Sequence, residues 1–98
     1  MADLTSIQGV IGPTGNVVSG NGFAVTRTNT GEYQVQFKTQ FAKLPAVVGS
    51  QVLFGGDNQD PRDNVVFPFL NSLGFTAIVG DSAGRRADRS FAFIAMAT

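Results

Sequence analysis

The side chains best suited to bind a ligand or do chemistry lie in two polar loops, of which the first spans residues 55–64. Its candidate residues are Asp57, Asn58, Asp60, Arg62, Asp63 and Asn64. Carboxylate and amide oxygens are hard ligands that could suit calcium, but their spacing here differs from that of an EF-hand loop. Asp and Asn also form turns with their own backbone. We favour a solvated connection of that kind, so no metal ligand is assigned.

The second polar loop spans residues 80–89. Its candidate residues are Arg85, Arg86, Asp88 and Arg89. The forked guanidinium group of Arg pairs well with carboxylates and can also bond sugar hydroxyls. The loop is therefore either a hairpin tip whose charges pair with one another or across a subunit boundary, or a ligand site. We favour the paired charges, and we keep the residues of both loops as candidates for binding a ligand or a partner.

Catalysis is not expected from this composition. The chain has no His and no Cys, which removes the commonest general base and metal ligand and also the thiol nucleophile. Neither a disulfide nor a thiolate zinc site can form. The acidic residues lie almost entirely in Gly- and Asn-rich loops, away from apolar surroundings that would raise a carboxyl pKa for glycosidase chemistry. We predict a protein that is not an enzyme, with no catalytic residue, no metal and no cofactor.

The net charge and the hydropathy pattern limit the kinds of partner that the chain is expected to have. Seven basic and seven acidic side chains leave the 98 residues with no net charge, so nothing attracts nucleic acid or an anionic membrane over a distance. No apolar stretch approaches the roughly 20 residues that span a bilayer, and Met1–Leu4 lack the features of a signal peptide. We expect a soluble protein without nucleic-acid binding or membrane insertion, which is cytoplasmic if it is not carried on a virion.

The elements that must position the two loops are expected to be strands. Twelve Gly and four Pro recur at short intervals and leave almost no window for an amphipathic helix. Residues 32–44 begin with strict alternation of apolar and polar side chains, which predicts a strand with one wet face. Turn-forming residues at 28–31 join it to a strand that starts at Phe23, and the two strands form a hairpin. Tyr33 falls on the apolar parity, which favours core packing.

Further strands are expected downstream. Residues 46–54 are apolar at both ends, which is typical of a strand that is buried on both faces or passes beneath a loop. The run 65–70 contains Pro68, which cannot donate a hydrogen bond to a neighbouring strand, so this run should lie at a sheet edge or carry a bulge. A turn at 71–74 leads into a strand at 75–79.

The last predicted strand, residues 90–97, has two apolar faces. Phe91, Phe93 and Ala95 share one face. The other face carries Ala92, Ile94 and Met96, so neither is suited to water and something should cover both. We therefore assign Ala92, Ile94 and Met96 as candidates for an interface between subunits.

Together these elements predict an all-β fold, a small antiparallel β-sandwich of six to seven strands in one domain. Residues 23–98 form the sandwich. Residues 1–22 form an N-terminal arm or a first hairpin, because two short strand-like pieces there are separated and closed by Gly-rich turns.

Two resemblances are carried by apolar and turn residues. The first consists of Gly20-Asn21-Gly22-Phe23-Ala24-Val25-Thr26-Arg27, Gly31-Glu32-Tyr33-Gln34-Val35-Gln36-Phe37, Phe41 and Pro45-Ala46-Val47-Val48. It resembles a module of phage tail fibres and other virion appendages. The second runs from Val35 through Phe41, Pro45-Ala46-Val47-Val48, Asn64-Val65, Ser72, Gly74-Phe75 and Ser90-Phe91-Ala92-Phe93-Ile94-Ala95. It is similar to the H-type lectin domain.

The lectin resemblance implies a six-stranded antiparallel sandwich that trimerises and binds sugar at the clefts between subunits. This chain differs from such lectins in having no Trp or His for sugar stacking and bonding.

Our leading hypothesis is a non-catalytic structural protein of a phage or phage-like particle, an appendage, tail-fibre or capsid decoration protein located on the virion. Its partners would be further copies, as a trimer or a multiple of it, and a larger virion assembly or a cell-surface glycan. The alternative is a free-standing, carbohydrate-binding H-type-like lectin that uses the two polar loops at a subunit boundary.

Overall fold

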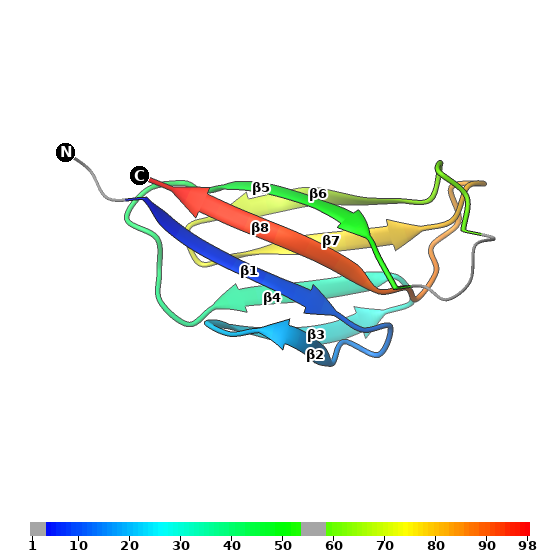
Figure 1. Ribbon diagram of the computed structural model, residues 1–98, viewed down its shortest axis with the longest axis horizontal. Coiled ribbons are helices and arrows are strands. Elements are labelled where there is room, and N and C mark those ends of the chain that lie inside the picture. The colour runs from blue at the N-terminus through cyan, green and yellow to red at the C-terminus, as the bar shows by residue number, and fades with distance from the viewer. Residues whose placement is uncertain (1–3, 54–58) are drawn as a thin grey trace.

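The computed structural model describes residues 4–53 and 59–98 (Figure 1). The described residues form eight strands and no helix. The strands are β1 (Thr5–Ile11), β2 (Val17–Gly20), β3 (Phe23–Asn29), β4 (Glu32–Phe37), β5 (Ala46–Gln51), β6 (Asn64–Asn71), β7 (Gly74–Gly80) and β8 (Phe91–Ala97). Phe54, the expected end of one strand, and the loop candidates Asp57 and Asn58 lie outside the described residues.

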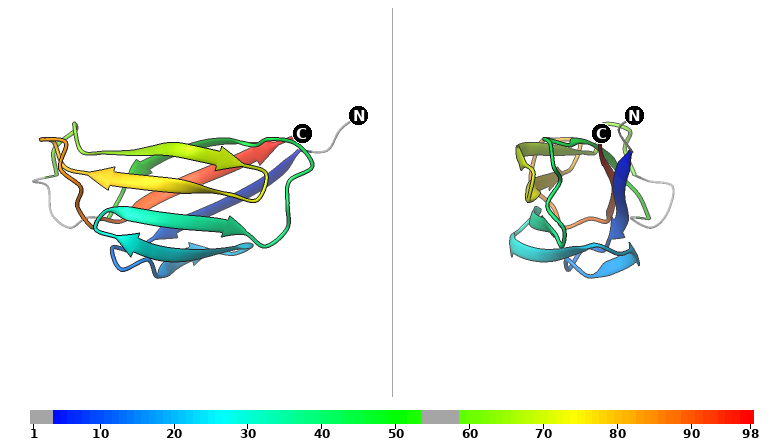
Figure 2. Two further views of the ribbon diagram at one scale, coloured as in Figure 1. Left: turned by 180° about the vertical axis from the view of Figure 1, so that it is seen from behind. Right: turned by 90° about the vertical axis from the view of Figure 1, so that its left-hand side faces the viewer.

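The strands form two antiparallel sheets of four. The first has the order β2-β1-β8-β5 and the second the order β3-β4-β7-β6. Figure 2 shows the two sheets as stacked layers. The prediction of an all-β antiparallel architecture is confirmed. The number of strands is eight rather than six to seven, because residues 5–20 form the β1–β2 hairpin and β1 pairs with β8 from Thr5–Ala97 to Ile11–Phe91.

The core lies between the layers and is built by alternation in the central strands. On β4, Tyr33 and Val35 are buried, and on β8 Phe91 and Phe93 are buried. The ring of Phe93 contacts that of Phe75 from the second sheet edge-on, with 4.9 Å between the centroids. Such aromatic pairs add about 0.5–1.5 kcal/mol beyond the burial of their area. The predicted inward face of β4 and the core position of Tyr33 are confirmed, and of the two apolar faces of β8 it is the one with Phe91 and Phe93 that enters the core.

The strand around Pro68 also follows its prediction. β6 is the edge strand of the second sheet, and its register with β7 shifts between Val66 and Phe69. Such a bulge turns a following side chain to the other face of the sheet. This shift decides the direction in which Phe69 points.

The prediction for residues 46–54 is wrong over the part that the structure describes. β5 is an edge strand of the first sheet and is neither buried on both faces nor covered by a loop, since Ala46, Val48 and Ser50 are exposed. An apolar run is buried on both faces only where a second layer covers each face. Here the second sheet covers one face of β5, and nothing else in the described chain covers the other.

Candidate functional site

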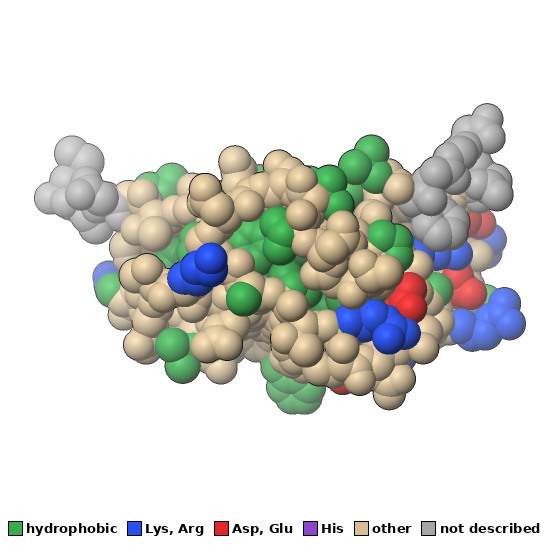
Figure 3. All heavy atoms as spheres, turned by 90° about the horizontal axis from the view of Figure 1, so that it is seen from below, with side chains coloured by type: hydrophobic (Ala, Val, Ile, Leu, Met, Phe, Trp, Pro, Cys, Tyr) green, Lys and Arg blue, Asp and Glu red, His purple; other side chains and the backbone are tan. Residues whose placement is uncertain are grey.

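The two polar loops meet at one end of the sandwich. They emerge side by side because Asn64, at the start of β6, pairs with Gly80, at the end of β7. Asp63 and Arg89 form an ion pair across the loops, with 2.7 Å between Oδ2 and Nη1 and side chains only 4% and 15% exposed. In Figure 3, acidic and basic side chains gather at this end of the molecule.

Gln51, the last residue of β5, ties the first sheet to this junction. Its Nε2 donates hydrogen bonds to the carbonyl oxygens of Asn64 at 2.8 Å and Gly80 at 2.6 Å. Its Oε1 accepts a hydrogen bond from Gln59 at 3.2 Å. One nearly buried amide therefore joins β5, β6, β7 and the first polar loop. Sequence reasoning missed Gln51, because its role depends on three strand ends that meet only in the folded chain.

Several of the loop candidates pair with an oppositely charged neighbour. The guanidinium–carboxylate contacts are Arg62–Asp60 at 2.9 Å, Arg85–Asp81 at 3.4 Å and Arg86–Glu32 at 3.1 Å. Arg62–Asp60 and Arg85–Asp81 each lie within one loop, as expected, whereas Arg86 pairs with Glu32 at the start of β4. The Arg side chain of each pair is more than half exposed, and exposed pairs contribute little to stability because water and salt screen them. Whether the loops also bind a sugar or a partner stays a prediction.

Asp88 contacts three residues of the β3–β4 hairpin. Its Oδ1 accepts hydrogen bonds from Arg27 Nε at 3.0 Å, the backbone N–H of Gly31 at 2.8 Å and the Tyr33 hydroxyl at 3.3 Å. The hydrogen bond from Arg27 is the largest cause that lowers the pKa of the Asp88 carboxyl below its usual value. Asp88 thus fastens the second polar loop to the β3–β4 hairpin.

The hairpin turn accepts this contact because residue 31 is a glycine. Gly31 has φ of 65°, in the left-handed region that disfavours other residues. A Cβ there would also press against the carbonyl oxygen of Val79. Because no side chain holds the turn away from β7, the Gly31 N–H can reach the Asp88 carboxylate and donate its hydrogen bond there. The turn at Gly31 and the loop that carries Asp88 are therefore held together.

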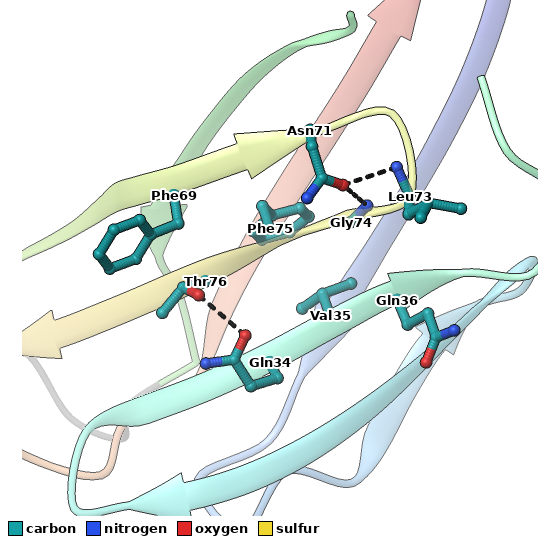
Figure 4. Close-up of a pocket in the computed structure, with 9 residues that line it drawn as sticks. All are labelled: Gln34, Val35, Gln36, Phe69, Asn71, Leu73, Gly74, Phe75 and Thr76. Atoms are coloured by element: carbon teal, nitrogen blue, oxygen red, sulfur yellow. Dashed lines mark hydrogen bonds between the residues drawn. The ribbon is translucent and has the colours of Figure 1, made fainter. Parts of the chain in front are cut away.

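A second surface feature is a shallow hollow of about 240 Å³ on the outer face of the second sheet (Figure 4). One row of its side chains runs directly across three strands: Phe69 pairs with Thr76, and Thr76 pairs with Gln34. The next row is Asn71, Gly74 and Gln36. The missing side chain at Gly74 leaves the second row open in the middle. No candidate from the sequence falls here, and the one signal was Pro68, which marks the bulge beside Phe69.

The third feature is the outer face of the first sheet. It carries the predicted interface residues of β8, and Ile94 and Met96 are both 39% exposed while Ala92 is half-buried. Cross-strand pairing places Val48 of β5 beside Ile94 on the same face. The strands of this sheet contain no charged residue at all. The inner face of β8 is covered by the second sheet, whereas a cover for its outer face stays a prediction.

Metal-binding clusters and membrane spans are both absent from residues 4–53 and 59–98. Within these ranges no group of three or more His, Cys, Asp or Glu side chains is placed to hold a metal ion. The same ranges contain no helix long and apolar enough to cross a membrane.

The fold and these surfaces define the chain as a two-sheet antiparallel β protein with a charged end, a polar and aromatic hollow and an uncharged sheet face. Comparison with known protein families, curated proteins and solved structures found no match. The H-type lectin and virion-appendage resemblances therefore stay predictions.

Proposed function

We propose that this chain is a non-catalytic structural protein of a phage or phage-like particle, as an appendage, tail-fibre or capsid decoration protein. It works by self-association and by binding a surface or receptor. The observation that supports self-association is the uncharged outer face of the β2-β1-β8-β5 sheet, where Ile94, Met96 and Val48 are 39%, 39% and 63% exposed. The assignment to a virion rests on the resemblance of residues 20–48 to an appendage module.

An uncharged sheet face is expected at an interface between subunits. The cores of such interfaces are depleted of charged residues and enriched in apolar ones. Protein chains that stay single usually place charges, Pro or bulges on exposed sheet edges to prevent pairing. β6 has such protection in Pro68 and the bulge, whereas β5 has no charge, no Pro and an unbroken register with β8. The edge strands β5 and β6 are thus protected against pairing with another chain to different degrees, which favours association on the β5 side of the first sheet.

The shape of this face also fits a second copy of the chain. A hollow of about 340 Å³ lies between β5 and β8, rimmed by Val48 and Ile94, with Ser50 and Ala92 beside them. Its lining is apolar enough to receive an apolar side chain from a neighbouring copy. With no net charge, copies do not repel one another over a distance. We propose a homotrimer or a multiple of it, the assembly implied by the lectin resemblance, within an H-type-lectin-like sandwich.

Light scattering of the purified chain over a wide range of concentration tests this proposal. We expect a mass of three chains, or a multiple of three, that persists on dilution. A single-chain mass at every concentration would contradict assembly through the first sheet. The particle assignment is tested separately by mass spectrometry of particles purified from the cells that encode the chain, where absence of its peptides would contradict a virion location.

A further inference from the structure

We propose that the hollow on the outer face of the second sheet binds an uncharged saccharide. The residues that carry the inference are Phe69, Gln34, Gln36, Asn71 and Thr76. This site names a ligand class for the surface-binding part of the proposed function. It is separate from self-association because it lies on the opposite sheet from Ile94 and Met96, so either idea can fail while the other stands.

Phe69 is the aromatic residue of the site. It is 71% exposed, and within residues 4–53 and 59–98 it is the only large aromatic side chain left on the surface. Strict alternation from the inward-facing Val65 would turn residue 69 into the core, but the bulge between Val66 and Phe69 turns it outward. The face of an aromatic ring carries partial negative charge and packs well against the C–H groups on one side of a pyranose ring.

Two amide side chains beside Phe69 are already held in place. The Thr76 hydroxyl donates a 2.8 Å hydrogen bond to Gln34 Oε1, which fixes the orientation of that amide (Figure 4). Asn71 Oδ1 accepts hydrogen bonds from the backbone N–H groups of Leu73 at 2.8 Å and Gly74 at 3.1 Å. In both cases the carbonyl end of the amide is occupied, which leaves the NH₂ end as a donor toward a ligand oxygen.

Gln36 supplies the group that can accept as well as donate. It lies on β4 in register with Gly74, which has no side chain to separate it from Asn71. A side chain at position 74 would press against the carbonyl oxygen of Val35, so the opening is built into the sheet. Sugar hydroxyls both donate and accept hydrogen bonds, and a mixture of amide donors and acceptors around an apolar surface suits them.

The ligand is inferred to be neutral and small. None of the residues that line the hollow is ionisable, so an anionic group would gain no charged partner there. A volume of about 240 Å³ lies below the range of enclosed ligand pockets, which fits one sugar unit held on a surface. We expect a dissociation constant on the order of 1 mM for one unit, with repetition in an oligomer raising the avidity.

The test is an NMR titration of the full, ¹⁵N-labelled chain with glucose, galactose, N-acetylglucosamine and sialic acid. We expect at least one neutral sugar to shift the side-chain amide signals of Gln34, Gln36 and Asn71. Phe69→Ala should weaken this binding about tenfold, as is common for a central aromatic contact. Val66→Ala is the matched control, because Val66 is also exposed and apolar and lies on β6 outside the hollow.

Three outcomes would overturn the saccharide site. They are the absence of any shift up to about 50 mM of each neutral sugar, binding that survives Phe69→Ala unchanged, and a response to sialic acid alone. The spectrum of each variant shows whether it is folded. Light scattering on the same samples separates the two ideas, because loss of sugar binding with an intact oligomer overturns this site only, and sugar binding by a single chain overturns the assembly only.

Discussion

The Arg89 guanidinium lies 2.7 Å from the Asp63 carboxylate and joins the two polar loops at the point where β6 begins and β8 follows. Both side chains are nearly buried. A buried charge that loses its partner is costly because the interior solvates it poorly. The pair therefore holds the charged end of the sandwich together, whatever that end binds.

Removing the carboxylate of this pair should destabilise the fold. Asp63→Ala removes the 2.7 Å contact between this carboxylate and the Arg89 guanidinium, and we expect the free energy of unfolding in urea titrations to fall by more than it does in a variant that loses an exposed pair. Asp60→Ala is the matched control, because its partner Arg62 is 75% exposed and the loss should be much smaller. An equal decrease in the free energy of unfolding in the two variants would show that the buried pair contributes no more to stability than the exposed pair.

Acid should weaken the contacts of Asp88. The pKa of its carboxyl is lowered in the folded chain, chiefly by the hydrogen bond from Arg27, so the charged form stabilises the fold above the ordinary pKa of about 3.9. Asp88→Asn should therefore lower the melting temperature at pH 6. The gap between the melting temperatures of the variant and the unaltered protein should become smaller below pH 4. A difference that stays constant to about pH 2 would mean that the carboxylate charge is not what stabilises the loop.

The Tyr33 hydroxyl should lose its proton only at a pH well above the usual range for tyrosine. Burial is the main cause that raises the pKa of its hydroxyl to about 12, with the Asp88 charge adding to it. The fold favours the neutral phenol, so stability present below pH 10 should be lost as the pH rises toward 12. Because the chain has one Tyr, phenolate absorbance reports this group alone. Asp88→Asn should bring the midpoint closer to 10, and a midpoint near 10 in the folded, unaltered protein would contradict the buried hydroxyl.

A charge on the outer face of β8 should break the assembly. Ile94→Asp places a carboxylate in the middle of the proposed contact, where it would lose its hydration. We expect light scattering to show single chains that keep their folded circular-dichroism spectrum. Val66→Asp is the control, since Val66 is 50% exposed on the opposite sheet, and it should leave the mass unchanged. An oligomer that survives Ile94→Asp, or that dissociates equally in both variants, would exclude this face as the interface.

Local patterns were sufficient to predict the strands and most of their faces. The alternation along β4 identified which side chains enter the core, because successive residues of a strand point to opposite faces whatever its neighbours are. Along β8 the alternation separated two apolar faces, and only the position of the second sheet decided which of them is buried. Pro68 indicated an edge position or a bulge, because it has no N–H to donate to a neighbouring strand, and β6 has both. Composition by itself excluded cysteine and histidine chemistry, because the chain contains neither residue.

The folded chain alone determined the remaining features, namely which apolar strand faces are buried and which charged residues pair. The apolar run of β5 suggested burial on both faces, yet one of its faces is open, because burial depends on the layers above and below and not on the strand itself. Alternation alone would have buried Phe69, and the one-residue register shift turned it outward. The charges of Asp63 and Arg89 were visible in the sequence as candidates, but their pairing depends on where strands from two sheets end, which no local pattern specifies.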